Sequence, residues 1–314
     1  MQTELGNVTQ EKPGSTPLVS IVVVTFNSAA TVRETLDSLL QQRYVNLEII
    51  LCDDGSKDST VSLMTKWRDL NHTLFKRIEI LASPANQGIC KNLNAGYGAS
   101  RGDWVKPIAG DDILLPGAIP RYVEHALRGT ASALFAPVQA FRGNNSGSAG
   151  NDRVLPSPES AALISGDQTR LLEILRVRNI IAAPGVFFNR ADYVSIGGLD
   201  LRFKHLDDWP MWINFLQNGK SLVSLPDILV AYRLGDTISV SKNATSINRD
   251  FLQDHVTFYE NYQVGHLNIW RRWDRMLEVF RFKLAKDTLR EYPRIYKFTG
   301  VLRFLSPLYF FRRQ

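Results

Sequence analysis

Three pairs of adjacent aspartates are the strongest candidates for chemistry in this 314-residue sequence. The pairs are Asp53 with Asp54, Asp111 with Asp112, and Asp207 with Asp208. Two neighbouring carboxylates repel each other unless a cation or a proton lies between them. Mg²⁺ and Mn²⁺ prefer oxygen ligands and commonly bind one or two carboxylates together with the phosphates of a substrate. The second pair, at the end of an expected strand, therefore predicts a site for a divalent metal and a diphosphate.

The first pair follows a strand–helix–strand unit. Residues 19–24 and 47–52 are short apolar runs, typical of strands buried on both faces. Between them, Thr31 followed by Glu34 predicts a capping box that starts a helix. The apolar residues of this helix recur at helical spacing: Val32, Leu36, Leu39 and Leu40. Such a unit predicts a parallel α/β sheet, in which ligands bind at the carboxyl edge of the strands.

Further elements position the other two pairs. We expect strands over residues 78–81, 104–108, 133–141, 184–188 and 228–232, and helices over 89–99, 118–127 and 168–177. Pro107 indicates that the strand before Asp111 is interrupted or lies near an edge. The third pair opens a helix with Pro210 in its first turn. Residues 142–158, rich in Gly, Ser and Asn, predict a loop that either closes over substrate or is disordered.

Helix capping is the alternative role for all three pairs, because aspartate is a preferred N-cap residue. The first pair would belong to a simple turn if Asp58 or Ser59 caps the helix that carries Val61, Met64 and Trp67. Asp112 would cap the helix after Pro116. Asp207 or Asp208 would cap the helix they open, which is compatible with a catalytic role as well.

Composition indicates a globular protein with one large domain and an appendage, or two modest domains. Cys52 and Cys90 lack metal-ligand spacing, so we expect buried free thiols and a reducing compartment. Residues 1–17 are polar and without periodicity, which predicts a flexible leader rather than a signal peptide. No apolar stretch reaches the length that spans a bilayer.

The C-terminal region carries the excess positive charge. The whole chain has a net charge of +6, whereas residues 271–314 contain 12 Lys and Arg against 4 Asp and Glu, a net +8. One helical face is apolar: Trp270, Trp273, Leu277, Phe280 and Leu284. Residues 296–311 add aromatic side chains among basic ones. We expect a helical extension that either packs on the catalytic domain or binds an anionic membrane surface.

Taken together, four segments resemble the inverting glycosyltransferases of family 2, which have the GT-A fold and bind nucleotide-diphosphate sugars. The similar segments are residues 20–27, 53–60, Asn86-Gln87-Gly88 with Asn94 and Gly96, and Gly110-Asp111-Asp112. The resemblance covers residues 17–241. It implies a Rossmann-like mixed sheet flanked by helices over residues 18–245, followed by the basic and aromatic helical extension over 246–314.

The resemblance also implies roles for individual residues. It places a uracil or thymine ring near Thr25, Phe26 and Asp54, and the ribose and a Mn²⁺ or Mg²⁺ ion near Asp111 and Asp112. It makes Asp208, paired with Asp207, the general base on the acceptor hydroxyl. The other expected donor-binding residues are Asn27, Asn86, Gly88, Lys91 and Arg233. For Arg233 a contact with phosphate and an ion pair within the scaffold both remain open.

The sequence departs from the family pattern at three places. Ala109 stands where family members often have the first carboxylate of Asp-x-Asp-Asp, Leu93 replaces an arginine common before Asn94, and the usual histidine after Arg233 is absent. These departures keep a non-catalytic nucleotide-sugar or glycan-binding module as the alternative function. A nucleic-acid binder ranks last, because it leaves the acidic pairs unexplained.

We therefore expect a metal-dependent glycosyltransferase, with a UDP-sugar as the favoured donor. The lack of a signal peptide and the basic C-terminal region favour a cytoplasmic enzyme on the inner face of the cytoplasmic membrane. Its acceptor would be a lipid-linked glycan, such as an O-antigen or capsule precursor, and no nucleic acid is expected as a partner. The donor sugar, the acceptor, the linkage and the oligomeric state are not encoded in a recognisable motif.

Overall fold

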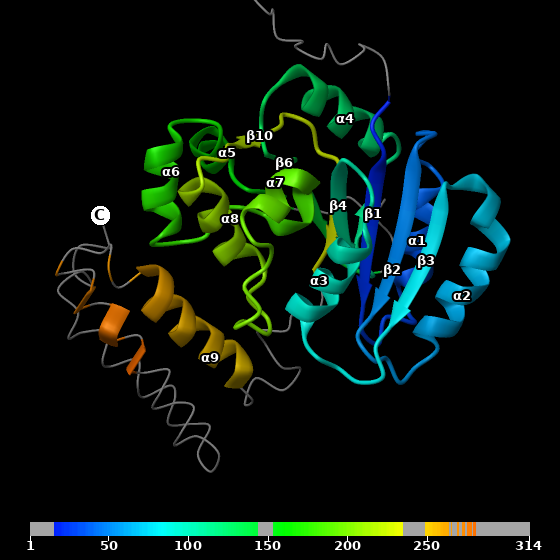
Figure 1. Ribbon diagram of the computed structural model, residues 1–314, viewed down its shortest axis with the longest axis horizontal. Helices are drawn as coiled ribbons and strands as arrows, with labels where there is room; N and C mark the ends of the chain where they lie inside the picture. The colour runs from blue at the N-terminus through cyan, green and yellow to red at the C-terminus, as the bar shows by residue number, and fades with distance from the viewer. Residues whose placement is uncertain are drawn as a thin grey trace, which may run out of the picture.

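The computed structural model describes residues 16–143, 153–234 and 249–263, and positions 265, 269, 272, 273, 275–277, 279 and 280. Its central sheet has seven strands in the order β10-β6-β9-β4-β1-β2-β3 (Figure 1). The bounds are β1 Val19–Thr25, β2 Leu47–Asp53, β3 Arg77–Ala82, β4 Trp104–Ala109, β6 Ala133–Phe135, β9 Val186–Asn189 and β10 Leu222–Ser224. β1, β2, β3 and β4 are parallel, whereas β9 runs antiparallel to both its neighbours.

The strand β1 lies near the centre of the sheet and is buried along its whole length, as its β-branched composition predicted. Val22 and Val24 face one core, and Ile21 and Val23 face the other, because successive side chains point to opposite faces. β1 pairs in parallel with β2 from Val19 onward. The predicted strand–helix–strand unit is confirmed.

Helices cover both faces of this sheet (Figure 1). One core is shared with α1 (Val32–Leu39), α2 (Thr60–Asn71) and α4 (Ala118–Arg128). The other is shared with α3 (Ile89–Ala99), α5 (Pro158–Ile164), α6 (Gln168–Leu175), α7 (Arg190–Ser195) and α8 (Asp208–Gln217). Short helical turns lie at η1 (His72–Leu74), η2 (Ala183–Gly185) and η3 (Tyr259–Gln263). The helix α9 (Arg249–Phe258) packs beyond α8, where the rings of Trp209 and Phe258 are 4.2 Å apart.

A second sheet has the order β5-β11-β7-β8, with β5 Ile113–Leu114, β11 Val230–Arg233, β7 Val138–Phe141 and β8 Val154–Leu155. The prediction of one strand over residues 133–141 was therefore wrong. The chain leaves the first sheet after Phe135 and enters the second at Val138, passing through Pro137, which has no N–H to continue a ladder. The backbone of Ala136 crosses Gly185 so closely that a Cβ at Gly185 would lie 1.9 Å from its carbonyl oxygen.

Of the two alternatives for the proline-containing strand, the edge position was wrong, since β4 lies between β1 and β9. The N–H groups of Trp104 and Gly110 point toward β1, where they donate to Leu18 and Val24. By alternation, position 107 faces the β9 side. β9 pairs only with Trp104 and Val105, so Pro107 lies beyond the last pair and interrupts no hydrogen bond.

The capping box predicted at Thr31 and Glu34 was wrong as well. Thr31 occupies the N-cap position of α1, but its side chain accepts no capping bond. Its hydroxyl instead donates to the carbonyl oxygen of Gly110 at 2.8 Å. Glu34 forms an ion pair with Arg233. Both side chains thus join α1 to the segment that carries Asp111 and Asp112.

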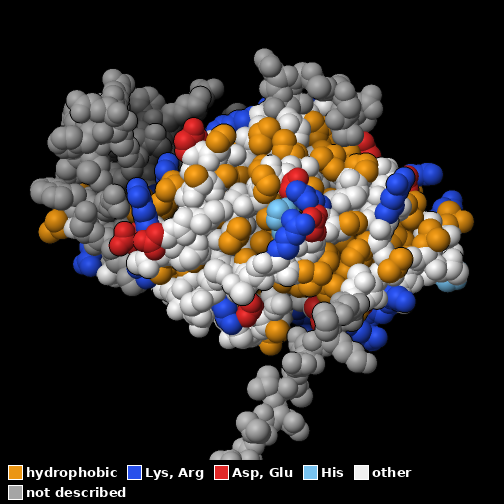
Figure 2. Space-filling view, turned by 90° about the horizontal axis from the view of Figure 1, so that it is seen from above, with side chains coloured by type: hydrophobic (Ala, Val, Ile, Leu, Met, Phe, Trp, Pro, Cys, Tyr) orange, Lys and Arg blue, Asp and Glu red, His pale blue; other side chains and the backbone are white. Residues whose placement is uncertain are grey.

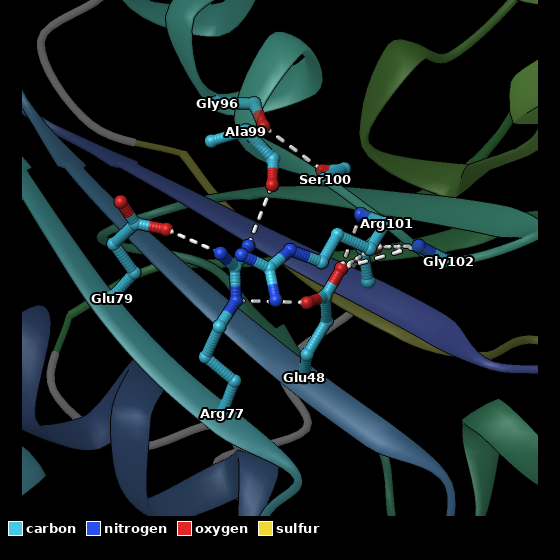
Figure 3. Close-up of polar contacts among 9 residues, drawn as sticks. Glu48, Arg77, Glu79, Gly96, Ala99, Ser100, Arg101 and Gly102 are labelled. Atoms are coloured by element: carbon cyan, nitrogen blue, oxygen red, sulfur yellow. Dashed lines mark hydrogen bonds and ion pairs between the residues drawn. The ribbon is translucent and has the colours of Figure 1, made fainter.

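A buried polar cluster fixes the opposite edge of the sheet (Figure 3). The carboxylate of Glu48, 1% exposed, accepts hydrogen bonds from Ser20 Oγ at 2.5 Å, from the backbone N–H of Arg101 at 2.5 Å and from Arg77 Nε at 3.0 Å. Arg77 also donates to the carbonyl oxygen of Ala99 at 2.6 Å. The turn between α3 and β4 is therefore held on the side of the sheet away from the aspartate pairs.

Both cysteines are buried free thiols, as expected. Within the residues that the structure describes, no helix is long and apolar enough to cross a bilayer. Most of the predicted basic and aromatic extension, including Trp270, Leu284 and residues 281–314, lies outside the described residues. In its described part, Trp273 and Phe280 are exposed and Val279 is buried.

Candidate functional site

A cleft at the carboxyl end of β4 brings one aspartate of the second pair together with both of the third. It has a cavity volume of about 150 Å³ and lies between β4, η2, α3 and α8. Asp112, Asp207 and Asp208 line it. The other lining side chains are mostly apolar: Val24, Ile89, Leu93, Tyr97, Pro107, Ile108, Ala109, Ala183, Pro184, Val186, Met211 and Trp212. An apolar cleft with a few convergent carboxylates is the usual form of a small-molecule site.

The carboxylate of Asp112 is fixed by a backbone N–H of β11 and does not cap a helix. Its Oδ1 accepts the N–H of Arg233 at 2.9 Å. Burial, followed by the charge of Asp111, raises the pKa of Asp112 to about 8. Burial also raises the pKa of Asp111, although Arg233 opposes this. The N-cap of α4 is Gly117, so the capping role considered for Asp112 is wrong.

Two cations lie beneath this pair. Lys106 is fully buried, and its ammonium donates to the carbonyl oxygens of Pro107 and Pro184, each at 2.7 Å. Burial lowers the pKa of Lys106 to about 7, and the charge of Asp112 opposes that change. The guanidinium of Arg233 donates to the carbonyl oxygen of Asp111 at 2.8 Å and pairs with Glu34. Arg233 therefore forms the scaffold ion pair, and its contact with phosphate stays a prediction.

The third pair opens α8 as predicted, with Asp207 at the N-cap and Asp208 as the first helical residue. The side chain of Asp207 makes no capping bond. Burial, followed by the charge of Asp208, raises the pKa of Asp207 to about 8. Burial raises the pKa of Asp208 as well. Both carboxyl groups still line the cleft, so the two side chains are surrounded by protein but can contact a ligand.

Two side chains that the sequence did not single out favour the ionised form of Asp208. The amide of Asn179 donates to Asp208 Oδ2 at 2.9 Å. The indole N–H of Trp212, on the same helix, also lowers the pKa of Asp208. Asn179 lies in a connecting segment without any motif, so no pattern could have identified it. Asp208 thus has the surroundings of an oriented base.

The first pair lies apart from this cleft and is bound internally. Asp53 accepts from the N–H of Ser56 at 2.8 Å and from Thr25 Oγ1 at 3.0 Å. Asp54 accepts from the N–H groups of Gln87 at 2.7 Å and Gly88 at 2.9 Å. These bonds fasten the turn after β2 to β1 and to the start of α3. The simple-turn alternative is supported in part, because Asp58 accepts the first N–H of α2, from Thr60, at 3.0 Å.

A second cleft, with a cavity volume of about 530 Å³, lies beside the first pair. Its lining includes Asp53, Asp54, Gln87, Lys91 and Asn92. The structure therefore brings Asp54 and Lys91 together, as expected of residues that share one ligand. Lys91 is exposed there.

The remaining expected donor-binding residues differ in whether their side chains are exposed to a ligand. The Thr25 side chain is 3% exposed and bonded to Asp53, so it faces the core. Phe26 is 47% exposed at the end of β1, and Asn86 is exposed before α3. Asn27 has φ 51°, and its Oδ1 accepts the N–H of Lys57 at 2.9 Å. Gly88 has φ 95°, a conformation that favours glycine.

A divalent cation fits the chemistry of the second pair. Asp111 and Asp112 offer hard oxygen ligands, which Mg²⁺ and Mn²⁺ prefer. In the described ranges no three His, Cys, Asp or Glu side chains gather as a metal site. Two carboxylates suffice when substrate phosphates and water supply the remaining ligands.

The fold matches solved glycosyltransferases. Residues 1–349 of TarS from S. aureus, in complex with UDP-GlcNAc, superpose with a TM-score of 0.61 at 15% identity, over 94% of this chain and 87% of that chain. The mannosyltransferase PcManGT from Pyrobaculum calidifontis, in complex with GDP-Man and Mn²⁺, gives 0.60 at 15% identity, over 95% and 77%. At this identity the likeness shows the fold, and the expected GT-A fold is confirmed.

Sequence comparison gives the family. An uncharacterized glycosyltransferase of Haemophilus influenzae is 26% identical over 260 residues, 78% of this chain and 75% of its own length. The putative glycosyltransferase EpsE of Bacillus subtilis is 25% identical over 227 residues, 70% and 74%. The succinoglycan biosynthesis protein ExoO of Rhizobium meliloti is 34% identical over 110 residues, 35% of this chain and 30% of its own length. The model of glycosyl transferase family 2 matches residues 20–188, more than half of the sequence, so the chain belongs to glycosyl transferase family 2.

Proposed function

We propose that this protein transfers a sugar, with inversion, from a nucleotide-diphosphate sugar to a hydroxyl group of a glycan acceptor. The observation that carries the proposal is the cleft in which Asp112 lies together with Asp207 and Asp208. One acidic group beside the leaving diphosphate and another beside the acceptor are what a single displacement requires.

Asp208 is the proposed general base. The acceptor oxygen attacks the anomeric carbon while the bond from that carbon to the diphosphate oxygen breaks. The hydroxyl proton passes to Asp208, and the nucleoside diphosphate leaves with the electron pair of the broken bond. Attack on the face opposite to the leaving group inverts the configuration. Asn179 orients the carboxylate through its 2.9 Å hydrogen bond, and Asp207 is the neighbouring group whose protonation is linked to that of Asp208.

Asp111 and Asp112 are the proposed ligands of Mn²⁺ or Mg²⁺. When bound, the ion stabilises the negative charge that develops on the leaving diphosphate. The missing carboxylate at Ala109 leaves these two side chains as the acidic groups of the segment. Near them, the buried amine of Lys106 donates to the carbonyl oxygens of Pro107 and Pro184.

The nucleoside is proposed to bind near the second cleft, with a UDP-sugar as the favoured donor. Asp54 and Lys91 line that cleft, and the exposed ring of Phe26 at the end of β1 is the third side chain proposed for the base and ribose. Asn27, Asn86 and Gly88 shape the two turns that border it. For Thr25 a role is proposed through its backbone, because its hydroxyl is bonded to Asp53.

A lipid-diphosphate-linked glycan in surface polysaccharide biosynthesis is the proposed acceptor. The printed name of ExoO, a succinoglycan biosynthesis protein, supports this class of product. The net +8 of residues 271–314 and the exposed Trp273 and Phe280 support attachment to the inner face of the cytoplasmic membrane. On the face shown in Figure 2, basic side chains lie next to acidic ones.

Vesicle sedimentation tests the proposed attachment to a membrane surface. The full chain is expected to sediment with anionic vesicles at low salt and to be released by added salt. Deletion after Gly300 is expected to reduce binding, and to reduce activity on lipid acceptors more than on soluble ones. Full-length protein that stays in the supernatant at low salt would leave the C-terminal region as a packing element or an oligomer contact.

A donor screen tests the reaction. UDP-, GDP- and dTDP-sugars are incubated with a synthetic lipid-diphosphate sugar and Mn²⁺ or Mg²⁺, and product configuration is read by NMR. One donor is expected to give product with the anomeric configuration inverted. A non-catalytic nucleotide-sugar or glycan-binding module is the second candidate, favoured by Ala109 in place of a carboxylate. It would bind a donor in the same screen without hydrolysis or transfer.

A further inference from the structure

The helix α9 places a buried carboxylate directly behind the proposed catalytic pair. Asp254 is only 3% exposed and accepts the backbone N–H groups of three consecutive residues. Its Oδ2 lies 3.0 Å from the nitrogen of Lys204, 2.6 Å from that of His205 and 3.2 Å from that of Leu206. Successive N–H groups that converge on one anion fix the backbone that carries them. The next residue of the chain is Asp207.

The same segment contacts the donor side of the protein. A Cβ on Gly88 would lie 2.4 Å from the side chain of Lys204 and 2.8 Å from its carbonyl oxygen. The N–H of Cys90 donates to that carbonyl oxygen at 3.5 Å. Gly88 in turn donates to Asp54. Residues 204–206 therefore lie between the turn that binds Asp54 and the acidic pair that opens α8.

We propose that Asp254 is a positioning residue for Asp207 and Asp208, which makes α9 a part of the catalytic apparatus. The inference rests on the proposed function, in which Asp208 is the general base. Asp254 does not line the cleft with Asp208, so its action passes through the backbone of residues 204–206. It also lies outside the segment matched by the family model, which ends at residue 188.

The attachment of α9 does not depend on Asp254 alone. Phe258 stacks near Trp209, with ring centroids 4.2 Å apart, and the hydroxyl of Tyr262 donates to Asp200 at 2.8 Å. Leu252 and Val256 are buried as well. A variant at position 254 is therefore expected to keep α9 in place while it releases the segment before the catalytic pair.

The test compares Asp254→Asn with Asp250→Asn. Asparagine keeps the size of the side chain but removes its negative charge, and only one of its two terminal atoms can still accept backbone N–H groups. Asp250 is the matched control, because it lies one turn earlier on α9 and accepts a hydrogen bond from the ammonium of Lys204 at 2.7 Å. We measure kcat and KM by transfer assay, donor Kd by calorimetry and the unfolding temperature.

Asp254→Asn is expected to lower kcat by roughly ten- to a hundredfold, the usual effect of a misplaced catalytic group, with donor Kd within about threefold of wild type. Asp250→Asn is expected to keep kcat within about twofold, as is usual for an exposed ion pair. A loss of kcat without a loss of donor affinity is a split that general destabilisation would not produce.

Asp208→Asn in the same assay separates the two levels of the proposal. If Asp254→Asn turns over like Asp250→Asn while Asp208→Asn is inactive, the positioning role is wrong and the proposed function stands. If Asp208→Asn is itself fully active, the proposed base is wrong and the inference fails with it. If Asp254→Asn does not fold, Asp254→Glu takes its place in the test. Glutamate keeps the negative charge, but one extra methylene displaces its carboxylate from the backbone N–H groups. Reduced kcat with unchanged donor Kd supports the inference, and wild-type kcat overturns it.

Discussion

The hydrogen bond from Asn179 to Asp208 gives a quantitative test of the proposed base. Asn179→Ala removes an amide donor that lies 2.9 Å from Asp208 Oδ2. Hydrogen bonds to charged groups stabilise them by about 1.5–3 kcal/mol, and the lower value applies because the carboxylate reaches a cleft where water can replace the amide. A change of about 1.4 kcal/mol corresponds to one pKa unit. The variant is therefore expected to raise the pKa of Asp208 by about one unit.

The sign of the effect on activity follows from the role of a base. Asp208 must be ionised to accept a proton, so a higher pKa moves the acidic limb of the kcat–pH profile to higher pH by about one unit. Below that limb, kcat is expected to be lower by about tenfold at a given pH, and to recover toward wild type on the alkaline side. The assay is initial-rate transfer across pH with saturating donor and acceptor.

The matched control is Asn218→Ala, which removes an amide at the other end of α8 that donates to the carbonyl oxygen of Asn214 at 2.9 Å. Both variants lose a side-chain-to-backbone contact, because Asn179 also accepts the N–H of Ile181 at 3.0 Å. The control is expected to keep the wild-type profile. A uniform loss of kcat in Asn179→Ala, with the acidic limb unmoved, would show that Asn179 does not act on the protonation of Asp208.

Three further predictions concern the acidic pairs. Asp208→Asn is expected to lose turnover by on the order of a hundredfold while calorimetry shows donor binding retained, and near-normal turnover would transfer the role of base to Asp207. Mn²⁺ or Mg²⁺ is expected to restore chelator-treated enzyme, and full activity of Asp112→Asn in excess chelator would exclude a metal held by that residue. The pKa of Asp207 is raised from 3.8 to about 8 in the folded protein, so the folded state retains a proton that the unfolded chain releases. Stability is therefore expected to fall as pH rises from about 4 to about 8, and urea unfolding should show a smaller fall in Asp207→Asn.

The parallel half of the sheet could be predicted from local sequence. The apolar runs at 19–24 and 47–52 correspond to β1 and β2, and the helix expected over 89–99 is α3. Such elements follow from periodicity, which depends only on neighbouring residues. The strand over 133–141 could not be divided correctly, because both of its halves are apolar and only tertiary pairing assigns them to different sheets.

The candidate site was predictable where adjacent residues carry the chemistry. Asp112, Asp207 and Asp208 meet in one cleft, as their places at element ends suggested. The partners of these groups were not predictable, because they come from distant parts of the chain. Glu34, interpreted as a capping residue, pairs with Arg233 across 199 positions. Lys106 carried one weak signal, a lysine inside an otherwise apolar strand, whereas Asp254 lies on a helix without any motif.

The short pairing between β4 and β9 leaves the carboxyl end of β4 to line the cleft. β9 pairs with β4 only at Trp104 and Val105, and beyond the last pair Pro107, Ile108 and Ala109 line the cleft. One further pair would extend the ladder along β4 by about 3.3 Å. Pro107, which offers no N–H, cannot extend the ladder. Strand pairing thus limits how far the ladder covers β4, and Pro107 maintains this limit, because a longer β9 would find no N–H to pair with at that position.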